Sequence, residues 1–376
     1  MLKDWFFFSS PFNEAQNPFN RGYGMSLKDK LIKNSTIDYT STLTDSKIYT
    51  KKDIIPTPVP VINVALSGSV DGGLTPGLTM LAGPSKHFKT GFALLMASAF
   101  LKKYKDGIIL FYDSEFGTPQ SYFKAFGIPF DSVIHTPIMD VEQLKFDIMQ
   151  QFKGIDREDH VLVIIDSIGN LASKKEVDDA LDGKSVADMT RAKQLKSLFR
   201  MITPHLSLKD IPLVAVNHTY EDMGMFPKQI VGGGTGAYYG ADNIWIIGRQ
   251  QDKVDNEIAG YHFIINIEKS RYVREKSRIP ITVSYDGGIN RWSGLLDVAM
   301  EGGYIVKPKA GWYATVDRAT GEVKQPSMRA NDFVFNKEFW MNMFSETDFA
   351  KYLENKYKVS HGAIMESEDD VVETNI

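Results

Sequence analysis

The sequence lacks several features that would point to common classes of protein. None of its 376 residues is cysteine, which excludes a disulfide framework, a thiol nucleophile and cysteine-based metal sites. No apolar run is long enough to span a bilayer, so we expect no membrane partner and a reducing cytoplasm as the compartment. Positive charge is not in excess either. With a formal net charge of −4, any contact with nucleic acid must come from local basic patches.

The composition is that of a globular protein with one large domain and a smaller appendage. Hydrophobic residues make up 43% and charged residues 24%, which is typical of folded domains. Residues 1–24 differ, because their aromatic side chains stand among Pro, Asn and Ser without a helical or strand period. We interpret them as an extension before a folded part that begins at Met25. Residues 359–376 are acidic at their end, and we expect them to be disordered.

Apolar, β-rich runs alternate with helical stretches through the middle of the chain. This alternation predicts an α/β fold with a mostly parallel, doubly wound sheet, and alternating strands at 262–267 and 279–285 follow it. Before the sheet, a short helix is expected within 26–50, and prolines predict an extended arm over 51–64. The strands of the parallel part are predicted at 78–82, 107–112, 161–165, 213–216 and 244–247.

The segment 78–91 holds the most informative pattern, a short strand followed by a loop of the phosphate-binding type and a helix. Its loop consists of Gly83, Pro84, Ser85, Lys86, His87, Phe88, Lys89 and Thr90, and Gly91 follows. Backbone N–H groups and the start of the helix would face an anion, Lys89 would reach the β- and γ-phosphates, and Thr90 would bind Mg²⁺. Phe88 stands where the motif has its second glycine, so a strand-to-helix turn that merely carries a lysine is the alternative.

Acidic residues follow two of the predicted strands. Asp166 ends the strand at 161–165 and is a candidate for the Mg²⁺ shell. Asp113 and Glu115 follow the strand at 107–112, and Glu115 is the candidate to orient or deprotonate an attacking water. Carboxylates that merely end strands in solvent are the alternative in both cases.

A long loop follows the strand at 213–216, which ends at Asn217 and His218. His218 is a candidate to sense the γ-phosphate, although a histidine that is simply hydrogen-bonded is equally expected. In the loop 220–236, apolar side chains could stack on or separate bases, while Lys228 contacts phosphate; a lid over the nucleotide is the alternative. The candidate DNA-binding residues of this loop are Met225, Phe226, Lys228, Ile230, Gly232, Gly233 and Gly234.

Two further pairs of cations are candidate binding residues. Lys174 and Lys175 lie in the segment 169–184, which taken alone reads as a solvated surface. Lys269 and Arg271 are placed on one face of a strand by its alternation, where they could contact a phosphate of a neighbouring subunit. A surface charge pair is the alternative for Lys269 and Arg271.

With these motifs assembled, residues 25 to about 357 resemble the RecA family and, within it, the UvsX-type recombinases of tailed bacteriophages. The motifs lie at 63–68, 83–90, 111–117, 166–175, 217–220, 232–236 and 286–290. The phage branch also has a bulky residue at the position of Phe88. The resemblance implies an N-terminal helix and protomer-docking arm at 25–60, a RecA-like ATPase core at 61–289 and a small α+β region at 290–358.

The resemblance also implies roles for individual residues. Glu115 would be the catalytic glutamate, with Lys89, Lys269 and Arg271 acting on the phosphates, the last two from a neighbouring protomer. Tyr122 would stack on adenine. The segments 169–184 and 220–236 would be the two DNA-binding loops, and the arm at 47–60 would dock on the adjacent core. The implied cofactors are ATP and Mg²⁺.

The expected function is that of an ATP-dependent recombinase in the host bacterial cytoplasm. It would form helical filaments on single-stranded DNA and exchange strands with homologous duplex DNA, with mediator and single-strand-binding proteins as partners. Two alternatives remain: a ring-forming helicase that shares the core fold, and a DNA-coating protein in which nucleotide is only a switch.

Overall fold

The computed structural model describes residues 25–50, 53–183, 189–222, 229–254, 257–285 and 288–359. The chain divides into two compact units, Met1–Lys51 and Lys52–Ile376. In the first unit, helix α1 (Leu27–Asn34) begins after Ser26, whose hydroxyl accepts the N–H of Asp29. A short helix α2 (Lys47–Thr50) follows. The helix predicted within 26–50 is therefore confirmed, whereas the extension before Met25 lies outside the described residues.

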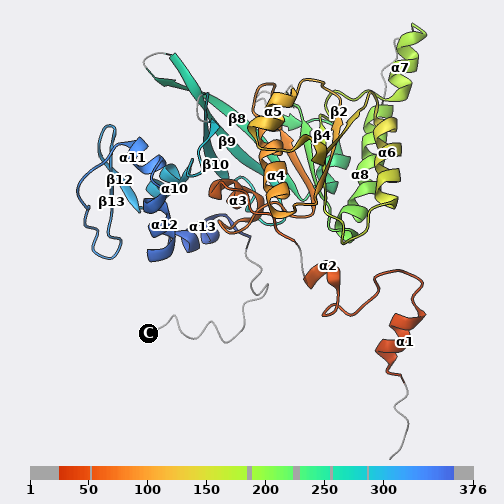
Figure 1. Ribbon diagram of the computed structural model, residues 1–376, viewed down its shortest axis with the longest axis horizontal. Helices are drawn as coiled ribbons and strands as arrows, with labels where there is room; N and C mark the ends of the chain where they lie inside the picture. The colour runs from red at the N-terminus through yellow and green to blue at the C-terminus, as the bar shows by residue number, and fades with distance from the viewer. Residues whose placement is uncertain are drawn as a thin grey trace, which may run out of the picture. The chain divides into compact units, whose positions relative to one another are not determined.

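The second unit is built around a sheet that has nine strands within the described residues (Figure 1). Its order is β11-β10-β9-β8-β1-β5-β4-β2-β3, in which the neighbours from β8 to β3 are parallel and β9, β10 and β11 are antiparallel. The predicted α/β fold with a mostly parallel sheet is confirmed. The strands are β1 (Gly77–Ala82), β2 (Ile108–Asp113), β3 (Val133–Pro137), β4 (Val161–Asp166), β5 (Pro212–Asn217), β8 (Asn243–Val254), β9 (Glu257–Ser270), β10 (Arg278–Ser284) and β11 (Gly288–Ile289).

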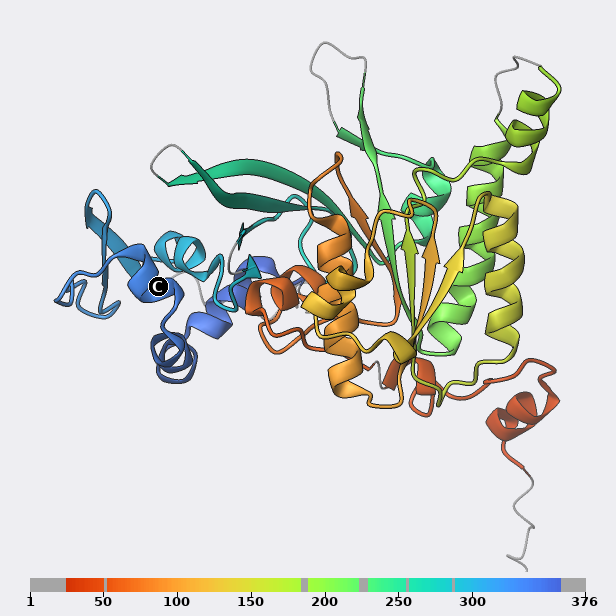
Figure 2. The ribbon, with the colours of Figure 1, turned by 45° about the horizontal axis from the view of Figure 1, so that its top comes forward.

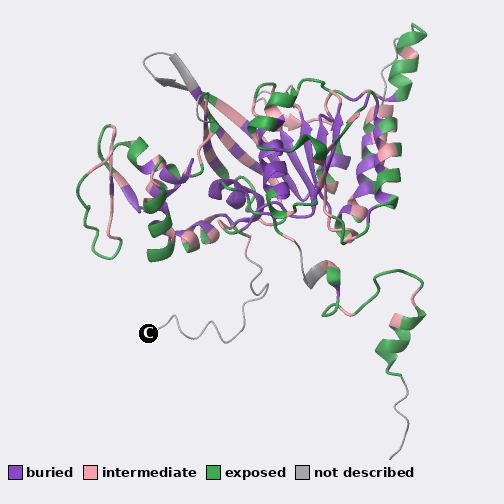
Figure 3. Cartoon of the chain, viewed as in Figure 1, coloured by how far each residue is buried: buried purple, intermediate pink, exposed green. Residues whose placement is uncertain are grey.

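Helices cover both faces of the parallel part of this sheet. Figures 1 and 2 show α4 (Lys89–Lys103) on one face, and α6 (Val141–Lys153) and α8 (Thr190–Leu208) on the other. Within β1, Leu81 packs into the core that contains α4, and Met80 into the core that contains α6 and α8. Since both faces of the central strands β1, β2, β4 and β5 are covered, these strands are mostly apolar, and Figure 3 draws them mainly in the colour of buried residues.

The register brings the carboxyl ends of the central strands together at one edge of the sheet. Asp113 at the end of β2 lies directly beside Asp166 at the end of β4. Ala82 at the end of β1 pairs with Asn217 at the end of β5. The loop after β1, the carboxylates and the segment after β5 therefore start from one edge, which is where open α/β sheets bind ligands.

The structure corrects two predicted segments. The arm predicted to be extended over 51–64 becomes helical at α3 (Pro60–Ser67), because a proline at the first helical position lacks only an N–H that has no partner there. The predicted loop 169–184 contains α7 (Lys174–Leu181), which begins with a reciprocal capping box between Ser173 and Glu176.

A smaller region of helices and a hairpin follows the sheet, as expected for an α+β region. Its core includes Phe333, Trp340 and Phe349, all buried. Within the described part of the chain, no helix is both long and apolar enough to cross a membrane. The elements are α10 (Leu295–Glu301), β12 (Ile305–Lys309), β13 (Trp312–Thr315), α11 (Ala330–Val334), α12 (Lys337–Glu346) and α13 (Phe349–Tyr357). The acidic end of the chain lies outside the described residues.

Candidate functional site

The loop between β1 and α4 holds two residues other than glycine in the left-handed conformation. Lys86 has φ +63° and Phe88 φ +57°, and such a conformation costs a side-chain-bearing residue roughly 1–2 kcal/mol. The ring of Phe88 packs edge-on against Phe92 and stacks on Phe263, with centroids 5.3 and 5.8 Å apart. Aromatic pairs contribute about 0.5–1.5 kcal/mol each, which offsets the strain. Packing therefore allows phenylalanine where the motif has glycine.

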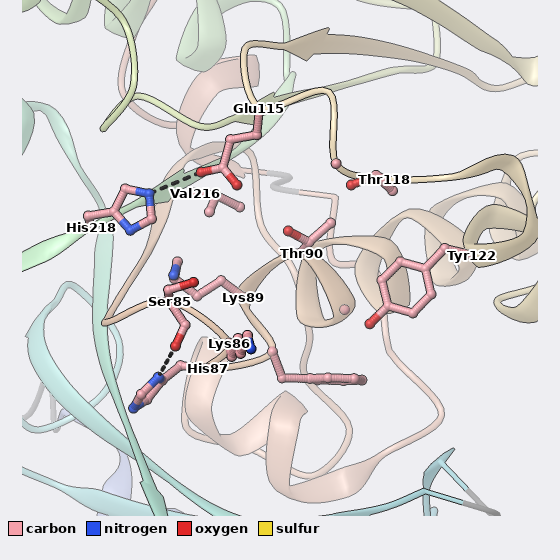
Figure 4. Close-up of a pocket in the computed structure, with 13 residues that line it drawn as sticks. Ser85, Lys86, His87, Lys89, Thr90, Glu115, Thr118, Tyr122, Val216 and His218 are labelled. Carbon is pink, nitrogen blue, oxygen red and sulfur yellow. Dashed lines mark hydrogen bonds and ion pairs between the residues drawn. The ribbon is translucent and has the colours of Figure 1, made fainter.

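Lys89, the first residue of α4, is the buried cation of this loop. Only 6% of the residue is exposed, and its ammonium donates to the carbonyls of Gly83 at 3.0 Å and Pro84 at 2.8 Å. Burial lowers the pKa of Lys89, while the charges of Glu115 and Asp166 oppose that shift. The ammonium is thus held among the loop atoms, and Figure 4 shows Lys89 in the middle of the pocket.

Thr90 and Asp166 meet at the same edge of the sheet. The Thr90 hydroxyl donates to Oδ2 of Asp166 at 2.9 Å, and the Thr118 hydroxyl lies 3.4 Å from the same oxygen. Within the described residues, Oδ1 of Asp166 is buried and has no hydrogen-bond partner. Burial, with smaller contributions from Glu115 and Asp113, raises the pKa of Asp166 to about 6, although the bond from Thr90 acts in the opposite direction.

These oxygens fit a hard divalent cation that also binds phosphate. An unpartnered buried carboxylate oxygen beside a hydroxyl supplies the oxygen ligands such a cation prefers. In the part of the chain that the structure describes, no group of three His, Asp or Glu side chains could hold a metal ion by itself. The arrangement therefore suits a cation held by few protein oxygens together with the phosphates of a ligand.

Glu115 lies above Thr90 in Figure 4, on the turn that follows β2. Oδ1 of Asp113 accepts the backbone N–H groups of Glu115 at 3.0 Å and Phe116 at 2.8 Å, so Asp113 fixes the turn. Oε1 of Glu115 accepts the Ser167 hydroxyl at 2.6 Å and lies 3.0 Å from Nε2 of His218. Sequence reasoning missed the role of Ser167, although its position directly after Asp166 at a strand end was a signal for it.

The predicted phosphate-binding residues surround one cavity of about 280 Å³. Tyr122, from α5 (Gln120–Ala125), lies on the opposite side of Thr90 from His218 in Figure 4. Gly83 and Pro84 do not line the cavity and serve Lys89 through their carbonyls. The predicted residues that line it are Ser85, Lys86, His87, Phe88, Lys89, Thr90, Gly91, Glu115, Tyr122 and His218.

The second predicted DNA loop is attached directly to this edge. Its two ends form a small hairpin, β6 (Thr219–Glu221) and β7 (Gln229–Val231), in which Ile230 lies opposite Tyr220. The amide of Asn217 donates to the carbonyl of Gly232 at 2.7 Å, and the N–H of Gly232 donates to the carbonyl of His218. Gly233 and Gly234 follow with positive φ. Met225, Phe226 and Lys228 lie outside the described residues.

The first predicted DNA loop begins at the end of β4. The side chain of Arg191 holds this segment by donating to the carbonyls of Ile168 and Gly169. Lys174 and Lys175 then form the first turn of α7, where Lys175 pairs with Asp179. Both predicted DNA segments thus leave the same edge of the sheet, but their contact with DNA stays a prediction.

Lys269 and Arg271 do not reach the cavity. The ammonium of Lys269 donates to the carbonyls of Tyr238 at 2.7 Å and Tyr239 at 3.3 Å, near the end of α9 (Thr235–Gly240). Arg271 forms an ion pair with Asp242. Burial and then the charge of Arg271 lower the pKa of Lys269, so the two cations are close enough to interact.

Comparison with known proteins agrees with this architecture. A family model of the RecA N-terminal domain matches residues 30–290. The model "Bacteriophage T4, Recombination and repair protein, C-terminal domain" matches residues 292–353. The chain is 48% identical to the recombination and repair protein of Enterobacteria phage T4 over 354 aligned residues. The alignment covers 93% of this chain and 89% of that protein.

Bacterial relatives are more distant. Protein RecA of Tropheryma whipplei (strain Twist) is 26% identical over 74% of this chain and 62% of its own length. Chromosomal RecA of Lactococcus lactis subsp. lactis (strain IL1403) is 25% identical over 82% of this chain and 78% of its own length. Because the RecA model spans more than half of the chain and the phage relative matches nearly all of it, the chain belongs to the RecA family.

Proposed function

We propose that this protein is an ATP-dependent homologous recombination protein. It binds single-stranded DNA, hydrolyses ATP in a DNA-stimulated reaction, and exchanges strands with a homologous duplex. The observation that carries the proposal is the 3.0 Å contact between Glu115 and His218. It joins the candidate catalytic carboxylate to the residue from which the second DNA segment begins, directly above Lys89 and Thr90 (Figure 4).

Five residues in and beside the cavity have defined tasks in hydrolysis. Lys89 exchanges the carbonyls of its own loop for phosphate oxygens, which offsets their negative charge. Thr90 and Asp166 hold Mg²⁺, which when bound neutralises charge that develops on the phosphates. Glu115 orients the attacking water and accepts its proton. The hydroxyl of Ser167 holds the Glu115 carboxylate in place.

The same contacts support coupling between nucleotide and DNA. His218 bonds to Glu115 through its ring and to Gly232 through its backbone carbonyl. A movement of the glycines when DNA binds is therefore transmitted to the carboxylate that positions water. This gives a physical reason for DNA to stimulate hydrolysis, and for ATP to favour DNA binding in return.

Assembly into a helical filament is supported by features of both units, each taken by itself. In the first, α1 exposes Leu27 and Leu31 by 73% and 63%, which leaves an apolar face suited to a neighbouring subunit. In the second, Lys269 and Arg271 lie away from the cavity of their own chain and could serve that of another subunit after exchanging their present partners for phosphate. Mediator and single-strand-binding partners, and the host cytoplasm as location, rest on the family relationship alone.

A three-strand exchange assay tests the proposal. The wild-type chain should exchange a homologous duplex in the presence of ATP and Mg²⁺ and leave a heterologous duplex intact. Lys89→Ala should abolish exchange, whereas Lys124→Ala, on the exposed side of α5, should not. Unwinding of heterologous duplex would favour the helicase alternative, and DNA binding that is indifferent to ATP would contradict the proposal.

A further inference from the structure

A second cavity, of about 890 Å³, adjoins the phosphate cavity. The two share Lys86, Phe88 and Tyr122 as lining residues. The walls of the second cavity are aromatic, and of the described residues that line it none is acidic. The aromatic residues are Phe88, Tyr122, Phe126, Tyr261, Phe263 and Tyr285. We call this the aromatic cavity.

The aromatic cavity is also lined by cations, and one of them, Arg249, bonds to the phosphate loop. The guanidinium of Arg249, from β8, lies over the ring of Tyr261 at 4.5 Å and donates to the carbonyl of Lys86 at 2.9 Å. Lys102 lines the cavity from α4. A pocket whose described lining offers several π-faces and cations beside a phosphate loop matches the chemistry that holds a nucleobase attached to phosphates.

Phe88 stands on the boundary between the two cavities. Phe126 contacts the rings of both Phe88 and Tyr122, at 6.5 and 5.5 Å between centroids, so the three rings form one continuous wall. Gly91 lets the Phe88 ring lie against the helix, because a Cβ there would approach the ring to 2.5 Å. Glycine would fit the backbone at Phe88 without strain, so the ring is needed for what it contacts.

The size of the phosphate cavity indicates what lies beyond it. Pockets that enclose a drug-sized ligand measure roughly 300–1,000 Å³, and the 280 Å³ of the phosphate cavity falls below that range. The shared lining residues give a nucleotide whose phosphates bind at Lys89 a direct route into the second cavity. Those residues are Lys86, Phe88 and Tyr122, and the space beyond them is the aromatic cavity.

We propose that Phe88 is a specificity-determining residue for the nucleotide: its ring forms part of the floor on which the base stacks at the mouth of the aromatic cavity. The inference rests on the proposed function, since it needs a nucleotide in the phosphate cavity. A purine presents a larger π-face than a pyrimidine, so the Phe88 floor favours purine triphosphates. The loop residue that departs from the glycine of the motif thus selects the base, while its neighbours Lys89 and Thr90 bind phosphate.

Calorimetric titration of the full-length chain with ATP, CTP and inorganic tripolyphosphate, each with Mg²⁺, tests this. Replacing Phe88 with leucine should weaken ATP binding roughly tenfold, as expected for one lost stacking partner, and change tripolyphosphate binding less than about twofold. The preference for ATP over CTP should shrink accordingly. Phe88→Tyr, which keeps an aromatic ring, should retain both the ATP affinity and the preference for ATP over CTP of the wild-type chain. In Phe88→Trp, emission should change with ATP but not with tripolyphosphate, after subtraction of the wild-type signal.

Phe92→Leu is the matched control. Phe92 packs against the Phe88 ring yet lines neither cavity, so its replacement should leave the preference for ATP over CTP unchanged. If Phe88→Leu does not fold, Phe88→Gly, which relieves the positive φ, carries the same comparison. Equal weakening of ATP and tripolyphosphate would assign Phe88 a role in the loop alone and overturn the inference. A wild-type chain that binds neither ligand would instead overturn the proposed function.

Discussion

The chain places its candidate phosphate-binding cations in two regions that differ in one respect. Lys89 lies inside the cavity it is expected to serve, held by the carbonyls of Gly83 and Pro84. Lys269 and Arg271 lie outside it, held by the end of α9 and by Asp242. Neither of them is among the described residues that line the cavity.

The difference indicates that a single chain can complete the nucleotide-binding part of the site but not the part proposed for hydrolysis. Nucleotide binding needs only groups that one chain already brings together, so a monomer should bind nucleotide. If Lys269 and Arg271 act as proposed, a full set of cations for hydrolysis needs a second chain, in which these two side chains exchange their internal partners for phosphate. Binding and turnover should therefore respond differently to mutation and to protein concentration.

The largest expected effect on ATP turnover comes from replacing the two cations of the second region. Lys269→Ala with Arg271→Ala should lower DNA-stimulated ATP turnover by on the order of 10³, the lower end of the range for a cation supplied by a neighbour. Nucleotide affinity measured on the monomer should stay within a few-fold, because neither side chain lines the cavity. Turnover on saturating single-stranded DNA and calorimetry without DNA measure the two quantities.

Mixing two inactive variants sharpens this test. Lys89→Ala subunits keep Lys269 and Arg271, whereas the double mutant keeps Lys89, so mixed filaments should regain part of the turnover. Lys276→Ala serves as the control, since Lys276 pairs with Glu268 near the same strand and faces solvent. A mixture with no more activity than its components would contradict supply from a neighbour.

A smaller loss is expected from Glu115→Gln. Glutamine can still accept the Ser167 hydroxyl but cannot take a proton from water, so turnover should fall by roughly 10², the lower end of the range for general base catalysis. Nucleotide and DNA binding should be retained, because Lys89, Thr90 and Asp166 are untouched. Steady-state turnover and DNA binding in the presence of ATP distinguish the two effects. Loss of nucleotide binding in this variant would move Glu115 from catalysis to binding.

Much of the first region could be predicted from sequence because its residues are local. A strand, a glycine loop and a Lys-Thr pair are contiguous in the chain, and a strand ending in Asp166 is readable from its apolar run. The structure added what depends on pairing between distant strands. The contact of His218 with Glu115 spans 103 residues, and the bond from Arg249 to Lys86 spans 163. No local pattern marks Arg249.

One segment predicted wrongly and one strand not predicted illustrate a second limit. Proline at position 60 was expected to exclude a helix, yet it occupies the one helical position where its missing N–H has no consequence. Edge strand β3 was missed because none of its residues is buried, so it lacks the continuous apolar run of the central strands. Helix boundaries and sheet edges depend on tertiary neighbours that the sequence does not display.

The smallest expected effect is on the free energy of unfolding of the ligand-free chain, through the buried carboxylate of Asp166 beside Lys89 and Thr90. Burial raises the pKa of Asp166 from 3.8 to about 6, so the folded chain holds a proton that the unfolded chain has lost between these values. Ionised Asp166 therefore destabilises the fold as pH rises through this window, and fully above about pH 6. Asp166→Asn should raise the free energy of unfolding by up to about 3 kcal/mol at pH 7.5, and most of the gain should be lost near pH 4. Urea titrations at both pH values measure it, with Asp131→Asn on the exposed surface as control. A gain of equal size at both pH values would assign the effect to packing. It would contradict the prediction that the buried charge of Asp166 destabilises the fold.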